Sequence, residues 1–209
     1  MNKKIASVLG AALVLAAADA SAQDVPPGRG LMLGVYGNLS AIQLDEDGGT
    51  QAENGPGAGA MVGFGLRNGW TFFARGTFAG ITYEEVDGGE LDGDGTYSMP
   101  VLELGARYGF ASGPNAALRL YGELGLSGTA LSDEGTIEGQ EVEFTFSGPA
   151  ILLGGGVEYD LSRNAALDVG MILGKGRFTS LEINGETFDD AEDLDFTTVR
   201  LNAGIVFRP

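Results

Sequence analysis

The sequence predicts an all-β protein, an eight-stranded antiparallel up-and-down transmembrane β-barrel. Three observations lead to this prediction. Eight segments alternate between apolar and polar residues, and most have about ten residues or more, the length of a tilted membrane-crossing strand. The connections between these segments alternate between short polar turns and longer acidic stretches. A secretory signal precedes them all.

The N-terminus has the three parts of that signal. Lys3 and Lys4 are followed by an apolar run over residues 5–18 and by small residues at 20–22, which fits cleavage before Gln23. The apolar run is shorter than the about 20 residues that a spanning helix needs. We therefore predict a cleaved signal peptide over residues 1–22 and one outer-membrane β-barrel domain over residues 23–209.

The strands are expected at residues 30–44, 57–67, 70–83, 97–110, 116–130, 145–160, 166–180 and 196–208. The last segment shows the pattern most clearly. One face carries Val199, Leu201, Ala203, Ile205 and Phe207, while the residues between them are mostly polar or small. Such a strand separates two different environments on its two faces.

Acidic residues are concentrated between the strands. Of the 29 Asp and Glu residues, 22 fall in residues 45–56, 84–96, 131–144 and 182–195, and no Lys or Arg lies in these windows. We interpret the windows as extracellular loops, because membrane barrels have short turns on the periplasmic side and longer loops outside. Signal removal takes two Lys and one Asp and leaves 10 basic against 28 acidic residues, a formal charge of −18. This charge argues against nucleic acid as a partner, since phosphates need cationic contacts.

Alternation alone does not distinguish a membrane barrel from a soluble sheet. Aromatic residues near the short turns, where an interfacial girdle belongs, favour the membrane: Trp70, Phe72, Tyr108, Phe110, Tyr159 and Phe207. A water-facing sheet would also carry scattered lysines, whereas residues 23–209 contain only Lys175. The alternative is a soluble lipocalin-type barrel, whose apolar faces would point inward around a ligand.

Charged residues on the polar faces balance four against four. The predicted inward groups are Arg75, Arg107, Arg119, Arg200, Glu103, Glu123, Glu158 and Asp168. Side chains just fill the interior of an eight-stranded barrel, so these groups have to pair with one another. We predict two stacked ionic layers and interpret them as structural filling. A gated ion path is the alternative.

Counting from the turns predicts which charges meet. It places Arg107 opposite Arg119, Glu103 opposite Glu123, and Glu158 opposite Asp168. Like charges directly opposite repel, so partners have to come from neighbouring strands. The expected contacts are Arg107 and Arg119 with Glu158 and Asp168, Arg75 with Glu103, and Arg200 with Glu123.

Several kinds of chemistry are excluded or unsupported. The chain has no His and no Cys, which excludes catalytic triads with His, Cys nucleophiles and His-ligated metals. The Gly154–Gly156 cluster precedes no helix, so it predicts no phosphate loop. The acidic run over residues 87–95 could chelate Ca²⁺, but its spacing does not match an EF-hand. We predict no enzymatic activity, no cofactor and no specific metal site, and we favour loose divalent-ion bridging to lipopolysaccharide at the outer rim.

The whole chain after the signal resembles the family of small outer-membrane β-barrels that includes the OmpA transmembrane domain and the Opa-like proteins. Residues 154–173 are similar to that family's penultimate hairpin, and residues 200–207 are similar to its closing strand. The family uses this strand, here the alternating residues from Val199 to Phe207, as a recognition signal for the assembly machinery. In this chain Arg208 and Pro209 follow the aromatic residue that normally comes last.

The resemblance implies a monomer in the cell outer membrane. It implies contacts with membrane lipid and lipopolysaccharide, and with periplasmic chaperones and the barrel assembly machinery during biogenesis. The family includes adhesins, envelope-integrity proteins and small pores. Two hypotheses for function therefore remain: a structural or surface-interaction protein, and a narrow porin-like channel for small solutes or ions.

Overall fold

The computed structural model describes residues 30–46, 49–66, 68–82, 96–110, 117–137, 140–188 and 194–209. The strands in this part of the chain are β1 (Gly30–Glu46), β2 (Gly49–Gly65), β3 (Trp70–Thr82), β4 (Thr96–Phe110), β5 (Leu118–Ile137), β6 (Gln140–Asp160), β7 (Ala165–Phe178), β8 (Ser180–Ile183), β9 (Glu186–Phe188) and β10 (Leu194–Phe207). The predicted signal peptide lies outside the described residues. No helix among them is long and apolar enough to span a membrane.

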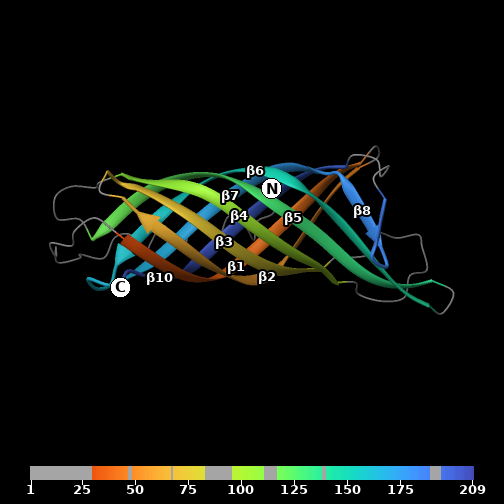
Figure 1. Ribbon diagram of the computed structural model, residues 1–209, viewed down its shortest axis with the longest axis horizontal. Helices are drawn as coiled ribbons and strands as arrows, with labels where there is room; N and C mark the ends of the chain where they lie inside the picture. The colour runs from red at the N-terminus through yellow and green to blue at the C-terminus, as the bar shows by residue number, and fades with distance from the viewer. Residues whose placement is uncertain are drawn as a thin grey trace.

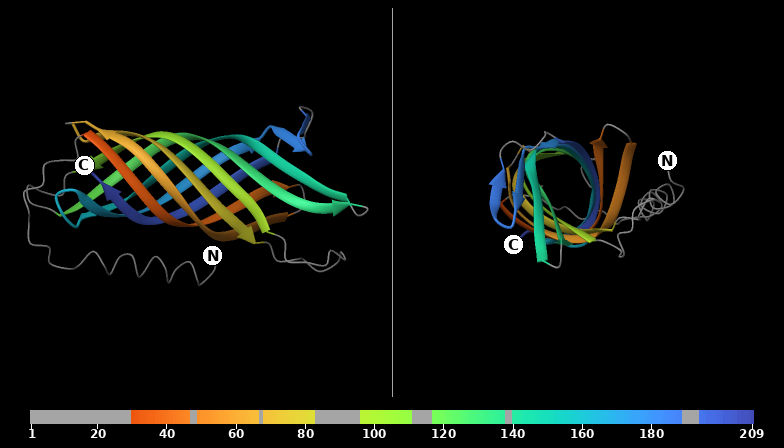
Figure 2. Two further views of the ribbon diagram at one scale, coloured as in Figure 1. Left: turned by 60° about the horizontal axis from the view of Figure 1, so that its bottom comes forward. Right: turned by 90° about the vertical axis from the view of Figure 1, so that its right-hand side faces the viewer.

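Eight of these strands close into an antiparallel barrel. Their order is β5-β4-β3-β2-β1-β10-β7-β6, and pairing of β5 with β6 completes the ring. The seam between the first and last strands runs from Leu33 opposite Phe207 to Leu44 opposite Phe196. Figure 1 shows the strands crossing the long axis obliquely, and the end-on view in Figure 2 shows the closed ring. The predicted fold class is thus confirmed.

Two of the four acidic windows form strands rather than loops. Strand β1 runs to Glu46 and β2 starts at Gly49, and β5 runs to Ile137 before β6 starts at Gln140. The expectation of long loops over residues 45–56 and 131–144 was therefore wrong. Antiparallel pairing continues through both windows to the hairpin tips, so the β5–β6 hairpin extends well past its neighbours at the loop end of the barrel (Figure 1). The window at 84–96 lies almost entirely outside the described residues.

A small hairpin that the sequence analysis did not predict follows β7. Strands β8 and β9 are joined by Asn184 and Gly185, which both have positive φ, 50° and 83°. Positive φ at both central residues defines the tight turn for which Asn-Gly is the strongest short-range signal. Strand β8 pairs with β6 and so widens the sheet at the loop end.

The outer face of the barrel is apolar. The side chains of Val35, Phe64, Phe72, Leu102, Leu104, Leu126, Ile151 and Leu153 are each more than half exposed. Near the short turns, the rings of Trp70 and Tyr108 lie 5.1 Å apart and those of Tyr108 and Phe110 lie 5.2 Å apart, between ring centroids. Because the apolar faces point outward, the lipocalin-type alternative is wrong for this chain.

The barrel interior has two zones. In the half nearer the loops lies a cluster that we call the inner apolar cluster, formed by Ile42, Ala79, Ile81, Met99, Val101, Leu131, Ala150, Phe178 and Phe196. The rings of Phe178 and Phe196 stack there with 4.3 Å between their centroids. The half nearer the short turns holds the charged residues and a smaller buried apolar cluster of Met32, Tyr36, Met61, Phe73 and Val206. Sequence analysis predicted the charged zone but not the apolar one.

Candidate functional site

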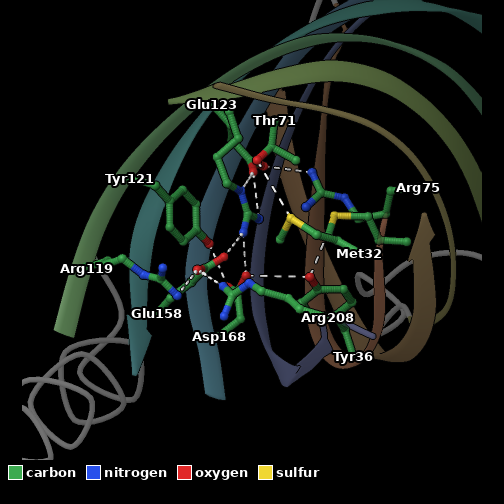
Figure 3. A network of polar contacts seen from close by, with 12 residues as sticks. Met32, Tyr36, Thr71, Arg75, Arg119, Tyr121, Glu123, Glu158, Asp168 and Arg208 are labelled. Atoms are coloured by element: carbon green, nitrogen blue, oxygen red, sulfur yellow. Dashed lines mark hydrogen bonds and ion pairs between the residues drawn. The ribbon is translucent and has the colours of Figure 1, made fainter. Parts of the chain in front are cut away.

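The eight predicted charged residues all lie on the inward faces of their strands. Seven of them are at most 7% exposed, and the Arg119 side chain is 18% exposed. They come from β3, β4, β5, β6, β7 and β10, so the site draws on most of the ring. Together with Asp160 and Arg208, these residues form what we call the ionic network, part of which is shown in Figure 3.

Arg107 lies at the centre of the network. Its Nη1 donates to Asp168 Oδ2 at 2.5 Å and to Glu158 Oε1 at 3.0 Å, while its Nε and Nη2 donate to Glu123 Oε2 at 3.1 and 3.0 Å. The guanidinium carbon lies 3.7 Å from the centre of the Tyr121 ring, and the Tyr121 hydroxyl donates to Asp168 Oδ1 at 2.7 Å. Each of the three guanidinium nitrogens of this arginine, and one face of its plane, therefore meets a buried group.

A second group lies nearer the inner apolar cluster. Arg75 donates to Glu103 at 2.6 Å and to Glu123 at 2.7 Å. Arg200 donates to the other oxygen of Glu103 and to the Thr77 hydroxyl, the latter at 2.9 Å. Because Glu123 bonds both Arg75 and Arg107, the two groups form one connected network rather than two separate layers.

Two members of the network were missed in the sequence analysis. Asp160 accepts from Arg119 at 2.5 Å and from Arg208 at 3.1 Å, and Arg208 also pairs with Glu158. Arg208 is only 7% exposed, although it follows the last strand. Both residues continue the period-two alternation of their strands, so extending that pattern by one step would have found them. With them the network has five arginines against five carboxylates and stays formally neutral.

The predicted strand register was partly wrong. Across β4 and β5, Arg107 faces Glu123 instead of Arg119, and Glu103 faces Ser127. Arg119 faces Glu158 across the next pair of strands. The other corrected contact is that of Arg200, which reaches Glu103 instead of Glu123. A slip of four residues keeps every side chain on its face, so the alternation does not report it.

The structure contains other predicted contacts of the charged residues. Glu158 faces Asp168 across β6 and β7, and Arg75 reaches Glu103. Arg107 contacts Glu158 and Asp168 as expected. Arg119 reaches Glu158 at 3.4 Å. The predicted assembly-signal residues of β10, from Val199 to Phe207, lie on the outer face, and Phe207 is half exposed.

Little open space remains where the ionic network meets the inner apolar cluster. A cavity of about 10 Å³ lies there, lined by Ser40, Met99, Val101, Glu103, Ser127, Thr129, Leu152, Ile172, Thr198, Val199 and Arg200. One water molecule needs about 10 to 15 Å³ on the same measure. The interior at this level therefore holds at most a single water.

A closed ring of tilted strands with an apolar exterior and a charged, hydrogen-bonded interior defines an integral membrane β-barrel. Comparison with known families identifies the kind of membrane barrel. The chain belongs to the family of outer membrane protein beta-barrel domains, which matches residues 8–207. The protein is accordingly an outer-membrane barrel.

Solved outer-membrane proteins share this fold at low sequence identity. Neisserial surface protein A is 17% identical with a TM-score of 0.53, and the match covers 85% of this chain and 97% of that one. OprG of Pseudomonas aeruginosa is 15% identical with a TM-score of 0.53 and coverage of 88% and 98%. Ail of Yersinia pestis, solved with the heparin analogue sucrose octasulfate, is 18% identical with a TM-score of 0.50 and coverage of 85% and 99%. A search of curated proteins found no match.

Proposed function

We propose that this protein is a non-conducting outer-membrane barrel with a structural or surface-interaction role. The observation that carries this proposal is the filling of the lumen by two barriers in series. The inner apolar cluster occupies the half nearer the loops, and the ionic network occupies the half nearer the short turns. An ion that crosses the barrel would meet first an apolar barrier and then a set of paired charges.

The ionic network is costly to open. Breaking a buried ion pair by losing one partner costs about 3 to 5 kcal/mol, because the remaining charge stays away from water. Glu103 is fully buried, and its two carboxylate oxygens are held by Arg75 and Arg200. The stacked rings of Phe178 and Phe196 form the second barrier above it. Together these contacts favour filling over conduction.

The surface role is supported by what projects from the barrel. The β5–β6 hairpin and the β8–β9 hairpin form a sheet at the loop end, joined by pairing of Phe144 with Ile183 and of Ser147 with Ser180. Glu143, Glu182 and Glu186 are exposed on this sheet. An acidic exposed sheet offers backbone and carboxylate groups to a partner outside the cell, while the membrane-facing wall offers contact with lipid.

A narrow channel is the second candidate, and one observation favours it. Glu158 is shared by Arg107, Arg119 and Arg208. A carboxylate with three arginine partners can release one of them without being left unpaired. Exchange of partners at Glu158 would open the turn-side end of the network for short periods, which predicts rare openings rather than steady conduction.

Planar-bilayer conductance tests the proposal against the channel. We expect no steady unitary conductance from the wild type, and none from the Phe178→Ala, Phe196→Ala double variant, because the ionic network still closes the barrel. Adding Arg107→Ala and Glu123→Ala also removes the centre of the ionic network and the carboxylate that joins its two groups, and should produce conductance. Steady conductance from the wild type would overturn the proposed closed lumen.

We also propose that the outer face of β10 is the assembly signal, read by the barrel assembly machinery. Phe207 is half exposed beside the seam, opposite Leu33 of β1. Phe207→Ser should lower the amount of protein in the outer membrane while leaving refolding of the purified chain into lipid vesicles unchanged. Ala203→Ser on the same face is the matched control. Equal loss of refolding would mean that Phe207 acts on stability instead.

A further inference from the structure

Among the strand residues that the structure describes, Lys175 and Arg177 of β7 are the only cations on the outer face. Lys175 faces Ile151, which is 62% exposed on the membrane side. Arg177 Nε donates to Asp195 Oδ1 at 2.6 Å, and the two side chains are 51% and 41% exposed. The other strand arginines all point into the barrel. We call Lys175 and Arg177 the outer basic pair.

A groove on the outer wall leads up to this pair. It has a volume of about 710 Å³ and is lined by Ala58, Gly76, Thr77, Phe78, Pro100, Val101, Leu102, Gly128, Thr129, Ala130, Ser147 and Gly148. Phe78 and Leu102 flank it and are 54% and 65% exposed. A Cβ built on Gly76 or Gly128 would meet no atom within 4 Å, so the space is open at both glycines. We call this feature the outer groove.

The outer groove climbs toward the loop end as it crosses the wall. Ala58 lies seven positions from the turn-side end of β2 at Gly65, whereas Gly148 lies twelve positions from the turn-side end of β6 at Asp160. At its upper end the groove lies against the strand that carries the outer basic pair, because a Cβ on Gly148 would overlap the backbone carbonyl oxygen of Arg177, and β6 pairs with β7 so that Ile151 faces Lys175. Figure 1 shows β2 to β5 side by side along this wall.

The size of the outer groove matches one acyl chain. The groove spans β2 to β6, which is four inter-strand spacings of about 4.8 Å, or about 19 Å. Half the hydrocarbon thickness of a bilayer is about 15 Å. A groove that crosses a leaflet obliquely therefore has the length of a single lipid chain in that leaflet.

We propose that the outer groove and the outer basic pair form one binding site for lipid A, the phosphorylated glycolipid anchor of lipopolysaccharide. A phosphate lies at Lys175 and Arg177, and one acyl chain descends through the groove toward Ala58. The loop end of a membrane barrel faces outward, so the site opens to the outer leaflet. Lys175 extends its aliphatic stem along the apolar wall and places its ammonium at the head-group level. This site does not depend on whether the barrel conducts.

The two parts of the site should contribute differently. Lys175→Gln with Arg177→Gln should weaken binding of lipid A about 30-fold, since each basic residue near anionic lipid is worth about a fivefold change. Filling the groove with Gly76→Leu and Gly128→Leu should weaken it about fivefold. The second effect is smaller because an acyl chain in lipid gains close packing but no transfer from water.

The test measures binding of lipid A to the full-length mature protein refolded in nanodiscs of phosphatidylcholine. The matched controls are Arg163→Gln, which removes an exposed cation at a short turn, and Ala203→Leu, which enlarges a small exposed residue on β10. Both should bind as the wild type does. Heat-modifiable migration on a gel checks that each variant is folded, and any variant that fails it is replaced by Lys175→Gln alone or Gly76→Val alone.

Four outcomes would overturn the proposal. Unchanged binding in the charge variant would show that the phosphate does not bind at the outer basic pair. Unchanged binding in the filled variant would show that the acyl chain does not lie in the outer groove. Equal competition by phosphatidylglycerol vesicles would mean that any anionic lipid fits. A change from dimer to monomer in the filled variant, with lipid binding unchanged, would make the groove an interface between copies of this chain.

Discussion

Replacing Arg107 with Met should destabilise the barrel more than any other single loss of charge in the ionic network. Arg107 is 3% exposed and contacts three carboxylates. Glu123 keeps Arg75 as a partner after the change, and Glu158 keeps partners at the turn-side end. Asp168 is fully buried, and among the described ion pairs Arg107 is its only cation.

The magnitude follows from the stranded Asp168 carboxylate. Removing one partner of a buried pair costs about 3 to 5 kcal/mol of unfolding free energy. Losing the stack on Tyr121 adds about 0.5 to 2 kcal/mol. Adding Asp168→Asn to Arg107→Met removes the stranded charge and leaves four arginines against four carboxylates. The Tyr121 hydroxyl can still donate to the amide oxygen that this second change introduces. The double variant should therefore recover about 2 to 3 kcal/mol.

Urea unfolding of the refolded protein in phosphatidylcholine vesicles measures these free energies. The matched control is Arg177→Met, which removes an arginine from the exposed pair with Asp195 and should cost at most about 1 kcal/mol. If Arg107→Met costs no more than Arg177→Met, the network is not a buried structural unit. If the double variant recovers nothing, the penalty does not come from Asp168.

Three further changes test other parts of the structure. Phe196→Ala removes a stacked, fully buried ring and should lower the unfolding free energy by about 3 to 5 kcal/mol without producing conductance; an unchanged urea midpoint would contradict the inner apolar cluster. Gly204→Ala places a Cβ against the Val35 carbonyl oxygen at the β1–β10 seam and should lower the unfolding free energy by about 1 to 3 kcal/mol. The control Gly76→Ala meets open space and should leave heat-modifiable migration on a gel unchanged. Replacing residues 180–188 with a Gly-Ser linker should leave a folded, inserted barrel, and loss of insertion would show that this hairpin is needed for folding.

The sequence was sufficient to place side chains on faces but not to set the register between strands. Every predicted inward charge lies inward, because alternation with a period of two is a local property of each strand. The pairing of Arg107 with Arg119 was wrong, because any slip by an even number of residues keeps the same faces inward. The structure places Glu123 opposite Arg107, and this register turns an expected repulsion between arginines into an ion pair.

Other features that the structure adds have a signal in the sequence. Arg208 continues the inward series of β10 by one step, and Asp160 does the same for β6. The Asn184-Gly185 turn is a hairpin signal inside a window that charge alone predicts to be a loop. The inner apolar cluster is different, since Phe178, Phe196 and Ile42 come from strands that meet only when the ring closes.

The charges on the barrel strands are explained by their neighbours: each inward carboxylate pairs with an inward arginine from another strand. Apart from the four acidic windows, the described residues include five Asp and Glu side chains, and all five lie in the ionic network with five arginines. Neutrality is therefore reached inside the barrel before any residue of the acidic windows is counted. The acidic windows themselves contain no Lys or Arg, and Asp195 of the last window pairs with Arg177 of the outer basic pair. Contacts with a partner outside the cell and contacts with lipid phosphate are thus expected on separate surfaces, and they can be removed independently by the variants described above.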